Sequence, residues 1–203
     1  MTWTNPTRYP NSMEIADNEA FLNTNVIDNL IDHETRINTA GLVRISGASF
    51  TTATDVVLPA DTFTAAYENY RIVLIAENSP TANIVGLRLR AGGTTLAAGY
   101  RYTAGTVYYG INWTHVTTLS DSYWTLAQND GGNGRVFSVI DIFAPYTSRA
   151  AKMYSAQSGG NRQGGEIRVT TGSVDDATLF DTAILRVTAG TFSGSYNVYG
   201  YRS

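Results

Sequence analysis

Two kinds of hydrophobic pattern follow one another along the chain. In residues 17–37 the apolar positions recur at intervals of three and four, which predicts one amphipathic α-helix. Asp17 is a suitable cap for its start, and the helix should end by Gly41. From Leu42 onward apolar residues recur at every second position, which is typical of β-strands. We therefore expect a mainly β protein that begins with a single α-helix.

The expected helix carries an apolar seam with two alternative partners. Ile27, Leu30 and Ile37 follow a heptad spacing, and Leu22 and Val26 widen the seam. Polar residues beside such a seam are a known means of setting register and oligomer number, so a bundle formed with copies of the same helix is favoured. The alternative is a helix packed on its own domain, because the seam is shorter than the three or more heptads of most coiled coils.

The β part divides into short strands separated by turn sequences. Strands are predicted at 70–77, 83–91, 111–119, 135–144, 150–158, 165–171, 180–188 and 195–201. Residues 70–77 (YRIVLIAE) are apolar on both faces, as expected of a central strand that is covered on both sides. Turns such as NDGGNG connect the strands, with no helical segment between them. The pattern predicts an antiparallel, jelly-roll-like β-sandwich over residues 41–203, preceded by an N-terminal arm and helix over residues 1–40.

Composition and charge narrow the class of partner. Charged residues make up 15% of the chain, against roughly 25% in typical soluble domains, which fits a surface covered by other subunits. The net charge of −3 divides into 2 − 6 = −4 for residues 1–40 and 12 − 11 = +1 for the remainder. We therefore expect neither nucleic acid nor an anionic membrane as a partner. The chain has no cysteine, and we expect neither a signal peptide nor a membrane-spanning segment.

No motif for catalysis or for cofactor binding stands out. Patterns of serine hydrolases, zinc proteases, P-loops and dinucleotide-binding folds are absent, so we expect a protein without enzyme activity, metal or cofactor. Asp141 lies on the apolar face of the strand expected at 135–144, where a buried carboxylate requires a partner. Arg88 or Arg90 could supply this partner in a structural ion pair.

Aromatic residues are concentrated between positions 100 and 124. Rings with a polar edge suit subunit interfaces and sugar-binding surfaces alike. Candidate glycan contacts are Tyr108, Tyr109, Trp113 and Trp124. The alternative is that these rings fill the core or a subunit contact. Exposure is expected at Tyr108 and Tyr109, where a loop is expected, whereas Trp113 lies in the strand-like INWTHV and is expected in the core or an interface.

Several short motifs resemble structural proteins of tailed bacteriophages. An aromatic residue near Met1 is followed by a polar arm and by LNTNVIDNLIDHETRI (22–37), which resembles the pattern LNT-x-(V/L)-x-DNL found in such N-termini. Asn23, Asp28, Asn29 and Leu30 match this pattern. Further similar stretches are ENYRIVL (68–74), LRLRAGG (87–93), TSRAAKMYSAQ (147–157) and the closing YNVYGYRS.

This resemblance implies a virion subunit assembled in the host cytoplasm, such as a short tail fibre, a head fibre or knob, or a capsid decoration protein. Such proteins are usually homotrimers with an N-terminal anchor and a β-rich distal domain. The implied anchoring or oligomer contacts are Trp3, Leu22, Val26, Ile27, Leu30 and Ile37. The implied partners are copies of this chain and other phage structural proteins.

Two alternatives remain for the function. One is a carbohydrate-binding module of the tail, used in host attachment, whose partner would be a host surface glycan. The other is a polysaccharide depolymerase, which would need two carboxylates in one cleft.

Overall fold

The computed structural model describes residues 41–78, 83–108, 113–129, 134–160 and 165–202. Every regular element within these ranges is a β-strand, and the paired strands run antiparallel, so the prediction of a mainly β, antiparallel protein is confirmed. The helix expected at 17–37 lies outside the described residues. Leu42–Arg202 forms one compact unit.

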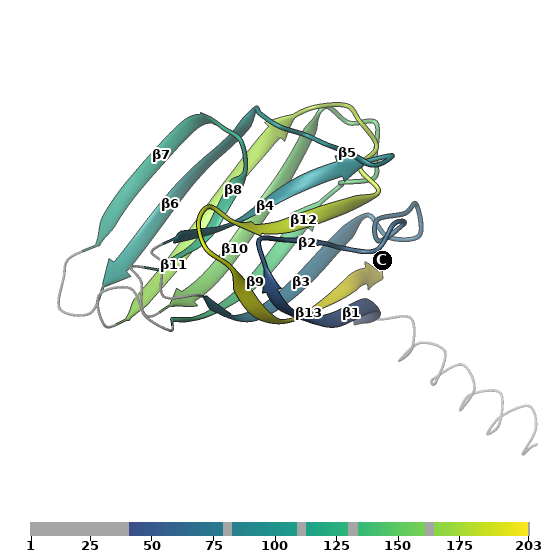
Figure 1. Cartoon of the computed structure of the whole chain (residues 1–203). Coiled ribbons are helices and arrows are strands. Elements are labelled where there is room, and N and C mark those ends of the chain that lie inside the picture. Colours follow the sequence, from purple (N-terminus) through teal and green to yellow (C-terminus); the bar gives the residue numbers. More distant parts are fainter. Residues whose placement is uncertain (1–40, 79–82, 109–112, 130–133, 161–164, 203) are drawn as a thin grey trace, which may run out of the picture. The chain divides into compact units, whose positions relative to one another are not determined.

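The strands form two sheets that pack face to face (Figure 1). The large sheet has the spatial order β1 (Gly41–Ala53), β13 (Phe192–Arg202), β3 (Asn69–Asn78), β9 (Arg135–Phe143), β10 (Ala151–Gly160), β11 (Glu166–Asp175), β6 (Tyr100–Tyr108) and β7 (Thr114–Asp121). The small sheet has the order β2 (Asp55–Val57), β12 (Thr182–Val187), β4 (Asn83–Ala91) and β5 (Thr94–Thr95), and β8 (Trp124–Asn129) also pairs with β4. The large sheet therefore extends well beyond the area that the small sheet can cover.

The core lies between the two sheets and is rich in aromatic rings. Trp124 stacks on Tyr154 with ring centroids 4.4 Å apart, and Tyr100 meets Trp124 edge-on at 5.2 Å. The Tyr100 hydroxyl accepts a hydrogen bond from the Leu89 N–H (2.8 Å) and donates one to the Leu96 carbonyl (3.2 Å). Partnered hydroxyls allow such rings to be buried without a lost hydrogen bond.

Most of the predicted strands are present. The predictions at 70–77, 83–91, 135–144 and 150–158 correspond to β3, β4, β9 and β10. The prediction of a loop at Tyr108 is wrong, because β6 continues to Tyr108, which pairs in register with Glu166. The sequence YRYTAGTVY hides this strand because its inward positions include the polar Thr106 and its outward positions the apolar Val107, so the alternation is irregular.

The pattern of 70–77 predicted a strand covered on both sides, and the described structure covers only one. Ile72 and Leu74 of β3 face the small sheet and are fully buried. Val73 and Ile75 point to the opposite side of the large sheet, where no described strand packs. This outward side is called the outer face below.

Candidate functional site: the outer face of the large sheet

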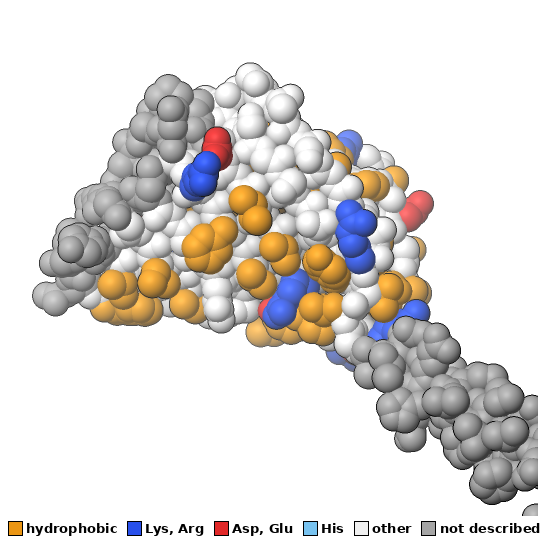
Figure 2. Space-filling model, turned by 90° about the horizontal axis from the view of Figure 1, so that it is seen from below, with side chains coloured by type: hydrophobic (Ala, Val, Ile, Leu, Met, Phe, Trp, Pro, Cys, Tyr) orange, Lys and Arg blue, Asp and Glu red, His pale blue; other side chains and the backbone are white. Residues whose placement is uncertain are grey.

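Hydrophobic side chains gather on the outer face, and few charged side chains stand among them (Figure 2). Antiparallel sheets with one solvated side normally place polar residues there. Here Ile167 is 65% exposed, Trp113 60% and Phe137 57%. Other large hydrophobic side chains exposed on the same face are Ile75, Phe143, Met153, Val169 and Leu119. Contiguous apolar surface of this kind marks an interaction site.

The strand register aligns outer-face residues in two adjacent rows, which are apolar except for Gln157 and His115. The first row contains Ile75, Phe137, Gly159, Ile167 and Val107. The second row contains Val73, Val139, Gln157, Val169, Gly105 and His115. Neither row contains Asp, Glu, Lys or Arg. We call these two rows, together with Trp113, the apolar belt; it crosses six strands from β3 to β7.

Two aromatic rings of the belt lie directly over glycines. A Cβ atom on Gly159 would come 2.1 Å from Cε1 of Phe137, and one on Gly105 would come 1.9 Å from Cζ2 of Trp113. Only glycine permits such a close approach of a ring to the backbone. The rings therefore lie low on the sheet, a packing that also compensates glycine's weak support of a strand. The belt is flatter than its large side chains would otherwise make it.

Ion pairs border the belt on both sides. Arg135 Nε lies 2.7 Å from Glu77 Oε1 at one border. At the other, Arg71 donates two hydrogen bonds of 2.8 Å to the Asp141 carboxylate, and the Tyr201 hydroxyl donates a third of 2.6 Å. The ion pair expected for Asp141 is thus present, but with Arg71 rather than with Arg88 or Arg90.

The strand topology explains why Asp141 pairs with Arg71 and not with the predicted Arg88 or Arg90. Arg88 and Arg90 lie in β4 of the small sheet, whereas Arg71 lies opposite Asp141 in the β3–β9 ladder. Partial burial by itself raises the pKa of Asp141, but the hydrogen bonds from Arg71 and Tyr201 hold that pKa below its ordinary value. Burial and the hydrogen bond to Asp141 raise the pKa of Tyr201 to about 12.

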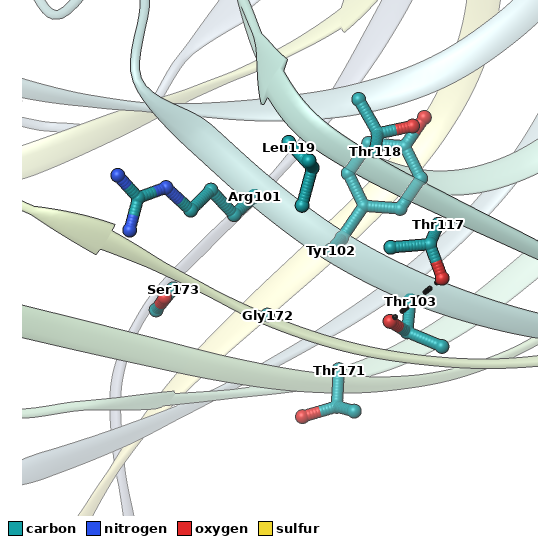
Figure 3. A pocket seen from close by; sticks show the side chains of 9 residues that line it. All are labelled: Arg101, Tyr102, Thr103, Thr117, Thr118, Leu119, Thr171, Gly172 and Ser173. Carbon is teal, nitrogen blue, oxygen red and sulfur yellow. Dashed lines mark hydrogen bonds between the residues drawn. The ribbon is translucent and has the colours of Figure 1, made fainter.

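A shallow hollow of about 210 Å³ lies at the β6–β7 end of the outer face (Figure 3). A β-bulge forms it, because two residues of β7 stand opposite Arg101 of β6. Its lining is Arg101, Tyr102, Thr103, Thr117, Thr118, Leu119, Thr171, Gly172 and Ser173, with a 3.4 Å hydrogen bond between the Thr103 and Thr117 hydroxyls. Hydroxyls and one guanidinium can exchange hydrogen bonds with a polyol, but the lining holds no carboxylate.

The structure separates the four candidate glycan residues. Trp124 is 0% exposed in the core, so its expected contact with a glycan is wrong: stacking on Tyr154 and an Nε1–H bond to the Ser173 carbonyl (3.3 Å) hold it there. Trp113 is exposed on the outer face, which excludes the core but fits an interface. The side chain of Tyr108 and the whole of Tyr109 lie outside the described residues.

The expected anchoring residues also lie outside the described part of the chain. They are Trp3, Leu22, Val26, Ile27, Leu30 and Ile37. Sequence reasoning missed the residues that form the belt, although the two-sided apolar pattern of 70–77 was the signal for it. The pattern identified the strand correctly, but both of its apolar sides were expected to be covered within the sandwich itself.

Several of the described carboxylates that were candidates for catalysis have structural partners. Glu166 pairs with Arg168 at 2.7 Å in a buried contact, Asp175 pairs with Arg101 at 2.7 Å, and Asp181 accepts the Gly92 N–H at 3.0 Å. Within the ranges that the structure describes, no three His, Asp or Glu side chains cluster in a way that could hold a metal ion. Nor do these ranges contain a helix with the length and hydropathy to cross a membrane.

Comparison with protein families and with curated proteins finds no match to this chain.

Proposed function

We propose that this chain is a non-enzymatic structural subunit of a tailed-bacteriophage virion, such as a short fibre, a knob or a capsid decoration protein. In this proposal residues 1–40 anchor the chain to the particle, and the sandwich is a jelly-roll-like domain that projects from it. The apolar belt carries the proposal, because a broad, flat, charge-free surface suits contact with another protein.

Two further observations support an assembly role. The low content of charged residues, 15%, fits a chain whose surface is partly covered by neighbours. The short motifs at the N-terminus and in the body resemble phage structural proteins, and they lie in the proposed anchor and in the proposed projecting domain alike.

Particle composition tests the proposal. Phage particles would be purified from a lysate of the host that produces the chain, then analysed by quantitative mass spectrometry and by antibody-labelled electron microscopy. We expect the chain at a constant ratio to the major capsid protein and at one location on the particle. Recovery of the chain only in the soluble fraction of the lysate, with none in particles, would contradict the proposal.

A carbohydrate-binding receptor module is the second candidate, and the hollow in Figure 3 favours it. Its lining offers the Thr103 and Thr117 hydroxyls, which hydrogen-bond each other, and the Arg101 guanidinium, which pairs with Asp175, as polar groups for a ligand. Titration of host surface polysaccharide into the protein tests this function. Thr103→Val and Thr117→Val keep the side-chain shape and should weaken the binding, whereas binding that both variants leave unchanged would rule out the hollow.

A further inference from the structure

We propose that the apolar belt packs against a second copy of this chain. This inference rests on the proposed function, and it names the partner that packs against the apolar belt. Three properties of the outer face lead to this partner: its area, its charge pattern and its flatness.

The outer face has the area of a stable interface. Eight strands about 4.8 Å apart span roughly 34 Å, and the nine residues of β9 at about 3.4 Å each span roughly 27 Å along the strands. The projected area of the whole outer face, about 900 Å², compares with the roughly 800 Å² that each partner buries in a standard-size interface, and the belt forms the apolar part of this face. An apolar centre with charged residues toward the borders is also the usual anatomy of an interface.

The charge pattern fits an identical partner better than one of strong charge. Most charged side chains bordering the belt form pairs of opposite sign, Glu77 with Arg135 and Arg71 with Asp141, whereas Arg44 at the β1 end hydrogen-bonds the Asn197 side chain (3.0 Å). The two pairs sum to zero charge, and the charge of Arg44 lies at the β1 edge of the sheet, so among the described residues no unpaired charge has to be buried at the centre of the contact. A strongly acidic or basic partner would find no counter-charge here. A copy of the same chain satisfies this pattern by presenting the same balanced surface.

Flatness makes close contact over the whole belt feasible. Phe137 and Trp113 would normally project several ångströms above a sheet, but each lies on a glycine, Gly159 and Gly105 respectively. Rings at this height form broad apolar anchors without leaving gaps beside the smaller Val169. Aromatic anchors contribute much of the affinity in protein interfaces, and Phe137 on β9 lies near the centre of this face, whereas Trp113 lies at its β7 edge.

The test uses two matched single-cysteine variants of the full chain, which has no native cysteine. Val169 lies in the belt and is 43% exposed, whereas Val57 lies on the outward side of the small sheet and is 45% exposed. The rate of maleimide labelling of Val169→Cys and Val57→Cys would be measured over a range of protein concentrations, together with the mass by light scattering. Circular dichroism would verify that both variants are folded.

We expect labelling of Val169→Cys to slow as the protein concentration rises and the mass becomes a multiple of 22.0 kDa, while Val57→Cys stays fast throughout. Equal labelling of both sites in an oligomer would overturn the proposal, since assembly would then use other residues. Labelling of Val169→Cys that is slow in a monomer at every concentration would also overturn it, because the chain would then cover its own belt. A wild-type protein that remains monomeric up to its solubility limit would overturn it as well.

A charge-bearing pair of variants tests the same contact by affinity. Val169→Arg should weaken self-association by at least about thirtyfold, because the cation would be buried without a partner, and Val57→Arg should leave it unchanged. If Val169→Arg fails to fold, Val169→Thr keeps the branched shape and should still weaken association more than Val57→Thr. Equal effects at the two positions would overturn the proposal.

The outcome is separable from the proposed function. A chain found in particles whose Val169→Cys and Val57→Cys variants label alike would remove this inference and leave the virion role standing. A chain that self-associates through the belt but is absent from particles would remove the virion role alone.

Discussion

Replacing Trp124 with alanine should strongly destabilise the sandwich. Trp124 is inaccessible to solvent, stacks on Tyr154 at 4.4 Å, meets Tyr100 at 5.2 Å and donates to the Ser173 carbonyl. Truncation of a buried Trp costs about 3–5 kcal/mol in the free energy of unfolding, through lost burial and the cavity left behind. The two ring contacts place this site in the upper half of that range.

The expected change is large enough to measure by thermal unfolding. For a domain of this size each kcal/mol shifts the melting temperature by about 2–4 °C, so a loss of about 4–5 kcal/mol lowers it by about 8–20 °C. Melts would be recorded by circular dichroism and calorimetry at two protein concentrations. The decrease should be the same at both, because Trp124 contacts only its own chain.

Trp113→Ala is the matched control, since it removes the same side chain from the outer face. At low concentration its melting temperature should lie close to that of the wild type, because an exposed ring loses little burial. At high concentration the deficit should increase if the belt is covered by a partner. A loss for Trp124→Ala below about 1 kcal/mol, or no greater than that of Trp113→Ala at low concentration, would refute the assignment of Trp124 to the core.

Three further predictions concern the hydrogen bonds, the glycines and the N-terminal segment. Tyr201→Phe should lower the free energy of unfolding by about 1–2 kcal/mol at neutral pH, measured by chemical unfolding, because a hydrogen bond to the Asp141 carboxylate is lost. Since the pKa of Asp141 is lowered in the folded state, this difference should disappear as the pH falls below 3.8 through that pKa. A difference that stays constant with pH would contradict this account. Gly172→Ala should cost about 3 kcal/mol or more in the free energy of unfolding, measured by thermal unfolding, because its Cβ would meet the Arg101 carbonyl oxygen at 2.0 Å. Gly159→Ala should cost less than about 1 kcal/mol, because only the exposed ring of Phe137 has to move. Similar costs for the two variants would show that the backbone at Gly172 moves to accommodate the methyl group. Deletion of residues 1–40 should leave the β-type circular dichroism spectrum intact and abolish incorporation into particles, and normal incorporation would place the anchor elsewhere.

Local patterns were sufficient to locate most strands because burial of one side of a sheet imposes a period of two. β9 shows this directly, with Val136, Ile140 and Ile142 buried and Phe137 exposed between them. β6 was missed because the polar Thr106 lies on its inward side and the apolar Val107 on its outward side, so its alternation is irregular. The partner of Asp141 was predicted wrongly for a different reason. An ion pair between β3 and β9 depends on which strands are neighbours in the sheet, and the hydrophobic period along one strand does not show its neighbours.

Residue types and their spacing were sufficient to predict a protein that is built from antiparallel strands, is poor in charge and lacks recognisable catalytic motifs. Packing in three dimensions was needed to place Trp124 in the core and Trp113 on the surface, although both were aromatic candidates for the same site. It also brought Ile75, Phe137 and Ile167 into one row. These residues are up to about ninety positions apart in the chain, and the strand order and register that align them result from packing over the whole sandwich.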